Sequence, residues 1–222
     1  MQKKGLIKKN IANDKKFVYA IPLKNTLNDF KNKLFNNLNE EDKDKVLILK
    51  SISDELIDWY ENNELEETYC FSDLKEFKKV STLLESYRIL KKNQLLNNFD
   101  ENELNKAGGL LLNKIKKQYF DYKDNKKLKD DLLKDAKKIF KSLDIEKYTI
   151  ILTTASKFVN KINTISSSNY IWNFKKFKNS LVFLDEFDSQ KHYYLDSIIS
   201  KSLSTSVDLV ELFRLMADTF KI

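Results

Sequence analysis

The stretch Ser180-Leu181-Val182-Phe183-Leu184-Asp185-Glu186-Phe187-Asp188 passes from a mostly apolar run directly into acidic residues. A short, continuous apolar run is typical of a strand buried in a parallel sheet. In open α/β sheets, ligands bind just beyond the carboxyl ends of such strands. We therefore expect a buried parallel strand that ends at a ligand-binding edge.

Carboxylates at such an edge suggest metal chemistry, because they can hold a hydrated Mg²⁺ and orient an attacking water. Two other interpretations fit the same residues. Asp and Ser are common helix caps, so the segment from Asp185 to Ser189 could simply join a strand to a helix. The acidic residues could also form a nuclease-like metal site, although no further acidic residues stand out on the neighbouring predicted strands.

Another strand is predicted at Phe17–Ile21, which is aromatic and β-branched. Pro22, the only proline of the chain, ends it. The turn that follows contains Lys24 and Asn25, and apolar residues at helical spacing then predict an amphipathic helix over 26–38. This order predicts a strand, a proline turn and a helix, which is also the pattern of an ordinary βα connection.

The middle of the chain has the periodicity of helices. A strand predicted at Val46–Leu49 follows a charged loop and precedes almost unbroken helical patterning, in which Asp100 is a plausible cap. The pair Gly108-Gly109 marks either a kink or a close helix contact. We expect a helical insertion over residues 52–146, whose charged faces are solvent-exposed or bind a partner.

Strand character returns at Tyr148–Leu152, and Thr153 and Thr154 come directly after it. A helix is expected to follow through Ile162, and then a flexible loop at Ser166–Asn169. Threonine also caps helices, so the two threonines have a purely structural explanation as well.

Taken in order, these segments resemble the first RecA-type lobe of the superfamily 2 helicase-type, or DExD-box, ATPases. The acidic strand end at 180–188 is similar to the Walker B motif, the Pro22 turn to motif Ia, and the Thr153-Thr154 turn to the Ib/Ic region. The resemblance implies an α/β fold with a partial parallel RecA-like sheet flanked by helices. It divides the chain into an incomplete core, residues 1–51 and 147–222, and the helical insertion.

The resemblance also implies roles for individual residues. Asp185 would bind Mg²⁺ through water, Glu186 would serve as metal-site and catalytic residue by polarising the attacking water, and Asp188 would couple nucleotide to nucleic acid. The expected nucleic-acid contacts are Pro22, Lys24, Asn25, Thr153 and Thr154. Mg²⁺ and ATP are the implied cofactors, and nucleic acid is the implied partner.

The chain departs from the family pattern in its glycines. It has three, Gly5, Gly108 and Gly109, so no window carries a Gly-rich phosphate loop or a GxxxxGK[ST] motif. The second lobe and its arginine finger are also missing from the sequence. We therefore expect a fragment or a degenerate form of the lobe that does not hydrolyse ATP alone.

Composition narrows the possible partners. The formal net charge is +7, but only Arg88 and Arg214 of the 40 basic residues are arginine, which is typical of a solvated surface more than of a specific nucleic-acid face. The single cysteine, Cys70, excludes an intramolecular disulfide framework and is compatible with a reducing cytoplasm. No apolar run approaches the roughly 20 residues of a membrane span.

A protein-interaction module rich in helices, or a secreted bacterial effector without catalysis, is the alternative function. The two hypotheses predict different architectures. The helicase-like hypothesis requires a parallel sheet in which Asp185 lies beside the ends of the strands at 17–21 and 148–152. The alternative allows these segments to be scattered through a helical arrangement.

Overall fold

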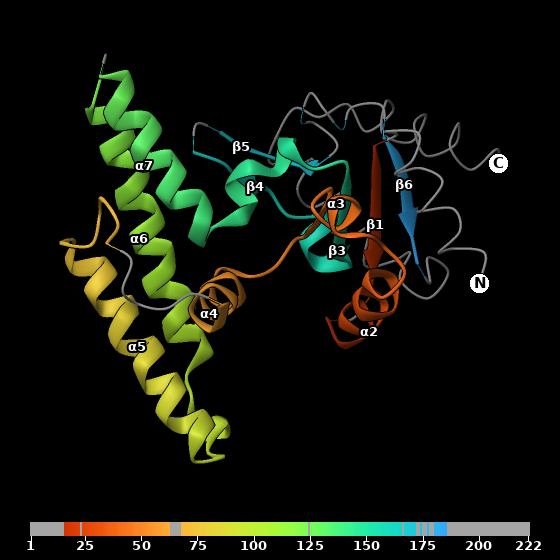
Figure 1. Cartoon of the computed structure of the whole chain (residues 1–222), viewed down its shortest axis with the longest axis horizontal. Coiled ribbons are helices and arrows are strands. Elements are labelled where there is room, and N and C mark those ends of the chain that lie inside the picture. The colour runs from red at the N-terminus through yellow and green to blue at the C-terminus, as the bar shows by residue number, and fades with distance from the viewer. Residues whose placement is uncertain are drawn as a thin grey trace, which may run out of the picture.

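The structure is a computed structural model and describes residues 16–22, 24–62, 68–123, 125–165, 167–171, 174, 177 and 180–185. Its helices are α2 (Lys24–Phe35), α3 (Glu40–Lys43), α4 (Ile52–Asn62), α5 (Lys75–Lys92), η1 (Leu96–Asn98), α6 (Glu101–Asp121), α7 (Lys126–Ile139), η2 (Lys141–Lys147) and α8 (Ala155–Phe158) (Figure 1). Its strands are β1 (Phe17–Ile21), β2 (Val46–Ile48), β3 (Ile150–Thr154), β4 (Ile162–Asn163), β5 (Ser168–Asn169) and β6 (Leu181–Leu184).

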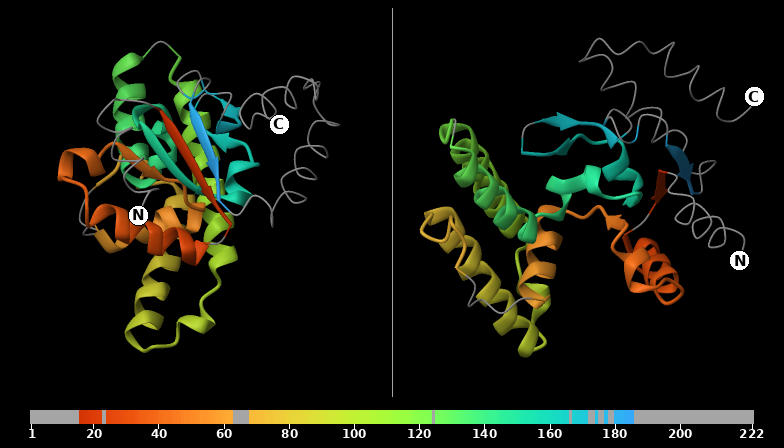
Figure 2. Two further views of the ribbon diagram at one scale, coloured as in Figure 1. Left: turned by 90° about the vertical axis from the view of Figure 1, so that its right-hand side faces the viewer. Right: turned by 45° about the horizontal axis from the view of Figure 1, so that its top comes forward.

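Four of the strands form one sheet in the order β2-β3-β1-β6, and every pairing in it is parallel. Strands that are far apart in the chain are therefore neighbours, as Figure 2 shows for β1, β3 and β6. The expected α/β class is confirmed, and so is the small parallel sheet flanked by helices.

The position of a strand in the sheet determines how far it is buried. All residues of the central strand β1 are buried, because neighbours cover both its edges and both its faces. Strand β6 lies at the end of the described sheet, and Leu181 is 45% exposed while the rest of the strand is partly buried. The strand expected at 181–184 is thus present, although it is less buried than its apolar sequence suggests.

The two faces of the sheet are covered by different elements. Tyr19 and Ile21 pack with Leu27 and Leu34 of α2 on one face. Val18 and other alternate residues pack against α8 and the segment after it on the opposite face. This division follows from the period of two in a strand, which sends successive side chains to opposite faces.

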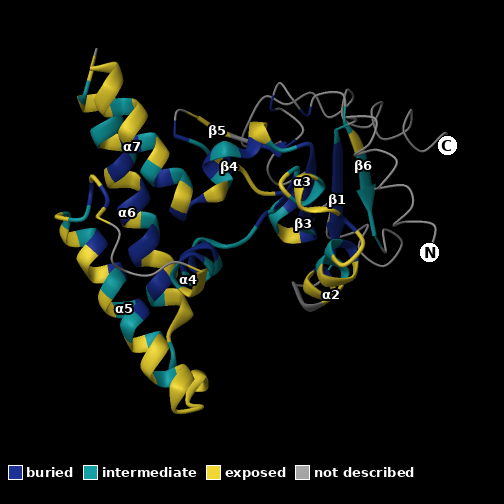
Figure 3. Cartoon of the chain, in the orientation of Figure 1, coloured by how far each residue is buried: buried dark blue, intermediate teal, exposed yellow. Residues whose placement is uncertain are grey.

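Helices α4 to α7 form a separate layer beside the sheet, on the left of Figure 1. They share one apolar core, to which α6 contributes Leu104, Leu111 and Ile115, whereas their outer faces are exposed (Figure 3). Gly108 marks a close contact in this core, because a Cβ at that position would lie 2.5 Å from Ile52 Cγ2 on α4. Of the two explanations for the glycine pair, the close helix contact therefore applies to Gly108.

Some local expectations were wrong. The segment 40–43, expected as a charged loop, is the short helix α3, because the Asn39 side chain accepts a hydrogen bond from the Asp42 N–H and caps it. The helix expected through Ile162 ends at Phe158, and Ile162–Asn163 pairs instead with Ser168–Asn169 in an antiparallel hairpin. The expected flexible loop at 166–169 is therefore partly a strand.

The sequence also predicts weak helicity at 2–10 and helices over 189–203 and 207–220, and all three segments lie outside the described residues. In the part of the chain that is described, the helices are all too short or too polar to cross a bilayer.

Candidate site at the carboxyl-end rim of the sheet

The parallel pairing brings three turns that are distant in sequence to one end of the sheet. Ile21 at the end of β1 is the register partner of Thr154 at the end of β3, and Ala20 is that of Leu184 at the end of β6. The Asp185 N–H continues the ladder by donating to the Ala20 carbonyl at 2.8 Å. Pro22, Thr154 and Asp185 therefore lie together at the carboxyl ends of the strands, and we call this end of the sheet the rim.

Asp185 is held in place at the rim by a tyrosine of the neighbouring strand. The Tyr19 hydroxyl donates a hydrogen bond to Asp185 Oδ2 at 2.8 Å, and Tyr19 itself is only 2% exposed. Its ring packs on Phe30 of α2, with the ring centroids 4.8 Å apart. Because a buried, packed ring fixes the donor, one oxygen of the Asp185 carboxylate is oriented while the side chain stays partly exposed.

The turn after β1 joins the rim to the start of α2. Pro22 follows β1 directly and is partly exposed, and α2 begins at Lys24, so Lys24 and Asn25 belong to its first turn. That turn carries no acidic residue. Since the amino end of a helix has a partial positive charge, this part of the rim is suited to anions such as a phosphodiester backbone.

The two threonines have different environments. Thr153 is fully buried, at 0% exposed, and its hydroxyl donates to the Thr154 carbonyl at 3.3 Å. Thr154 is partly exposed, and its Oγ1 accepts a hydrogen bond from the Lys157 N–H at 3.3 Å as the cap of α8. Of the pair, only Thr154 offers surface at the rim, and its hydroxyl already has a structural role.

The acidic residues beyond Asp185 cannot be placed. Glu186 and Asp188, expected as the catalytic and coupling residues, lie outside the described residues. Among the described residues there is no group of three or more His, Cys, Asp or Glu side chains that could hold a metal ion. The described rim thus provides an oriented Asp185 but not the full donor set of a Mg²⁺–ATP site, and the sequence supplies no phosphate loop.

Sequence reasoning did not identify Tyr19 as a residue of the rim. The alternation of side chains between the two faces of a strand could have indicated it. Tyr19 lies on the α2 face of β1, and Asp185 comes directly after Leu184, which lies on the other face. A parallel pairing in which Ala20 opposes Leu184 therefore puts Tyr19 and Asp185 on the same side, but the pairing had to be known first.

A scan against models of protein families found no match, and a search of curated proteins also found none.

Proposed function

We propose that the chain is a helicase-like RecA-type lobe, fragmentary or degenerate, that binds a nucleic-acid strand at the rim and does not hydrolyse ATP by itself. This proposal rests on the observation that Pro22, Thr154 and Asp185 lie together at the carboxyl ends of a parallel sheet. The resemblance to the helicase superfamily requires this arrangement, whereas a helix-rich interaction module does not.

The proposed absence of turnover follows from the phosphate chemistry. Transfer of a phosphoryl group needs a cradle of backbone N–H groups, a metal ion and a source of positive charge at the leaving phosphate. The described rim provides one oriented carboxylate, and none of the three glycines lies in a phosphate loop. A phosphate loop would have to come from outside these 222 residues.

The proposed location is the cytoplasm, where nucleic acid and ATP are both present. The one cysteine of the chain, Cys70, is exposed and free, which is compatible with a reducing compartment.

The binding part of the proposal is tested by fluorescence anisotropy with a labelled single-stranded oligonucleotide. Lys24→Glu reverses a charge in the first turn of α2, and Lys33→Glu does the same in its last turn. We expect Lys24→Glu to weaken binding and to lower the salt dependence by about one phosphate contact, with Lys33→Glu close to the unmodified protein. Equal effects of the two variants, or no binding at low salt, would contradict the proposal.

The catalytic part is tested by an ATP turnover assay with Mg²⁺. We expect no turnover above background with or without the oligonucleotide. Turnover that is abolished by Glu186→Gln would show that a complete active site exists in this chain.

The alternative, a protein-interaction module, is favoured by the surface of the helical layer. Leu110 and Phe120 of α6 are 60% and 57% exposed, although both are large and apolar. They are ten residues apart, which places them about 80° apart around the axis of α6, on adjoining parts of its exposed surface. Replacing both with Gln should abolish partner capture if this layer binds a protein, and should leave oligonucleotide binding unchanged.

A further inference from the structure

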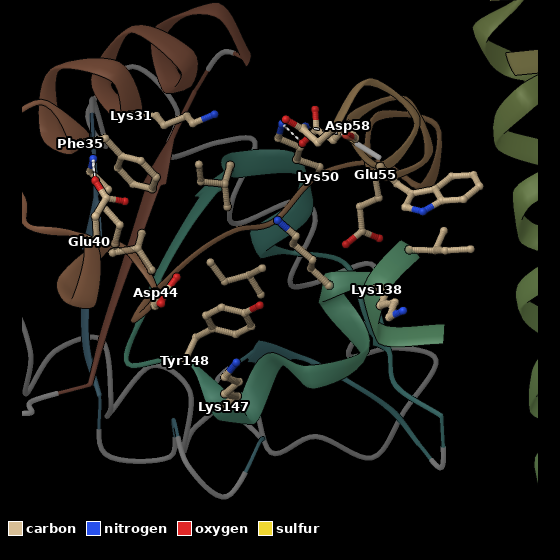
Figure 4. A pocket seen from close by; sticks show the side chains of 18 residues that line it. Lys31, Phe35, Glu40, Asp44, Lys50, Glu55, Asp58, Lys138, Lys147 and Tyr148 are labelled. Carbon is tan, nitrogen blue, oxygen red and sulfur yellow. Dashed lines mark hydrogen bonds and ion pairs between the residues drawn. The ribbon is translucent and has the colours of Figure 1, made fainter. Parts of the chain in front are cut away.

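A cavity of about 510 Å³ lies beside β2, the edge strand on the other side of the sheet from β6 and Asp185 (Figure 4). It lies between α2, α3, β2, α4 and η2. Strands β2 and β6 are the two ends of the strand order, so the cavity and Asp185 are three strand spacings apart, or roughly 14 Å. The volume is in the range of small-molecule sites and is too small for a folded partner. The cavity is thus a second candidate site, independent of the rim and of the function proposed for it.

Charged side chains from several elements line this cavity. Its lysines outnumber its acidic residues, and the lysines are Lys31, Lys43, Lys50, Lys138, Lys141 and Lys147. The acidic residues are Glu40, Asp44, Glu55 and Asp58.

Most of this negative charge is already engaged by neighbours. Glu40 pairs with Lys43 at 2.6 Å, and Asp58 pairs with Lys50. Glu55 is buried, and its two carboxylate oxygens accept hydrogen bonds from the N–H and the hydroxyl of Ser142 at 2.8 and 2.9 Å. These carboxylates have little capacity left to neutralise Lys31 and Lys141.

Lys31 and Lys141 make no ion pair with any described residue. The pKa of Lys31 is lowered, first by burial and then by repulsion from Lys50 and Lys141, with Asp58 acting in the opposite direction. In Figure 4 the Lys31 side chain extends from α2 toward the Lys50–Asp58 pair. Lys31, Lys50 and Lys141 therefore line one partly enclosed space, and of these three only Lys50 forms an ion pair with a described residue, Asp58. A bound anion would stabilise such an arrangement of ammonium groups.

The rest of the wall is apolar and partly aromatic. Phe35 of α2 and Tyr148, which precedes β3, are both partly buried, and the edge strand β2 contributes its apolar residues. The Lys31 ammonium lies 5.8 Å from the centre of the Phe35 ring. Rings next to a cationic cluster offer a flat ligand a stacking surface beside its charged group.

We propose that this cavity binds a small organic phosphate that carries a flat ring, with the phosphate at Lys31, Lys50 and Lys141 and the ring against Phe35 and Tyr148. A phosphate suits the cluster better than a carboxylate does, since it carries close to two negative charges for several compact ammonium groups. The open edge of β2, which among the described strands pairs only with β3, adds backbone donors and acceptors to the wall.

The test is isothermal titration calorimetry at constant ionic strength, with AMP as the probe and adenosine and inorganic phosphate for comparison. We expect saturable binding of AMP, weaker binding of phosphate, and none of adenosine. The Lys31→Gln/Lys141→Gln double variant should bind AMP at least about tenfold more weakly. Lys31→Arg/Lys141→Arg should keep the affinity within about threefold, because it keeps the charge.

Two controls separate this site from other causes. Lys114→Gln/Lys117→Gln removes two exposed lysines of α6 that do not line the cavity, and Asp185→Asn alters the rim; neither should change AMP binding. Circular dichroism checks that each variant is folded. The proposal is overturned if AMP does not bind saturably, if adenosine binds as well as AMP, or if the Gln double variant binds as tightly as the unmodified chain.

Discussion

The hydroxyl of Tyr19 donates a hydrogen bond to Asp185 across 166 residues of sequence, with the donor and acceptor oxygens 2.8 Å apart. It is a side-chain contact between β1 and the turn after β6, and it ties the acidic turn to the central strand of the sheet. The position of Asp185 at the rim depends on the backbone ladder and on this contact together.

Removing the Tyr19 hydroxyl should therefore weaken the fold measurably. We expect Tyr19→Phe to lower the free energy of unfolding by about 1–2 kcal/mol, because the bond has a charged acceptor and a buried donor. Urea denaturation provides the value, and a double-mutant cycle with Asp185→Ala isolates the pair.

Tyr122→Phe is the control for this prediction. Its hydroxyl, in the helical layer, makes no hydrogen bond to any described residue, so the change should stay within about 0.5 kcal/mol. A coupling energy near zero between Tyr19 and Asp185 would show that the contact does not hold the turn.

Glu55 should make the stability depend on pH. Burial raises the pKa of its carboxyl group from 4.5 to about 7, against the opposing hydrogen bonds from Ser142 and the charge of Lys157. Since the folded pKa lies above the unfolded one, the stabilising contribution is complete below pH 4.5 and is lost as the pH rises through 7. The loss should amount to about 3 kcal/mol between those limits.

The comparison of Glu55→Gln with the unmodified chain isolates this effect. The variant cannot ionise, so its stability relative to the unmodified chain should rise between pH 5 and pH 8, as measured by urea unfolding at several pH values. Glu146→Gln, at an exposed position, should show no such trend. If the unfolding free energies of Glu55→Gln and of the unmodified chain change with pH in the same way, the pKa of the Glu55 carboxyl group is not raised in the folded chain.

The two adjacent glycines of α6 should respond in opposite directions to alanine. A Cβ at position 108 would lie 2.5 Å from Ile52 Cγ2 and 2.6 Å from Leu56 Cδ1, while one at position 109 would meet nothing within 4 Å. We expect Gly108→Ala to destabilise the fold by about 1–2 kcal/mol, because crowding outweighs the gain in helix propensity. Gly109→Ala should stabilise it by up to about 1 kcal/mol.

Thermal and urea denaturation of the two variants check this prediction. The positions are matched in residue type and helix, so their difference reports the α4–α6 contact directly. Stabilisation by both substitutions would show that the helices are not so closely packed at Gly108.

Local sequence signals predicted much of the architecture. The apolar runs at Phe17–Ile21 and Leu181–Leu184 are strands, and Asp100 caps α6 by accepting hydrogen bonds from the N–H groups of Asn102 and Glu103. These features depend on side chains within a few residues, so their pattern is visible without the fold. The capping of α3 by Asn39 was local as well, but it was hidden in a charged segment that resembled a loop.

Features that depend on contacts between distant segments could not be predicted. The β4–β5 hairpin needs Ile162 to be buried next to the sheet, and its sequence continues a helical pattern. The bond between Tyr19 and Asp185 depends on the register of β1 and β6. The cavity beside β2 is lined by Lys31, Lys50 and Lys141, which come from different parts of the chain. Because lysines occur throughout the sequence, the sequence alone does not indicate which of them line the same cavity.

The central proposal is that a nucleic-acid strand lies along the rim. It is tested most directly by site-specific photo-crosslinking to a labelled single-stranded oligonucleotide. In a Cys70→Ser background, a cysteine for the crosslinker is placed at Asn25 or Thr154 on the rim, or at Glu146, which is exposed and precedes the amino end of β3. The account predicts crosslinks from positions 25 and 154 and none above background from 146. Crosslinks from 146 that equal or exceed those from the rim, or none from any position, would contradict it.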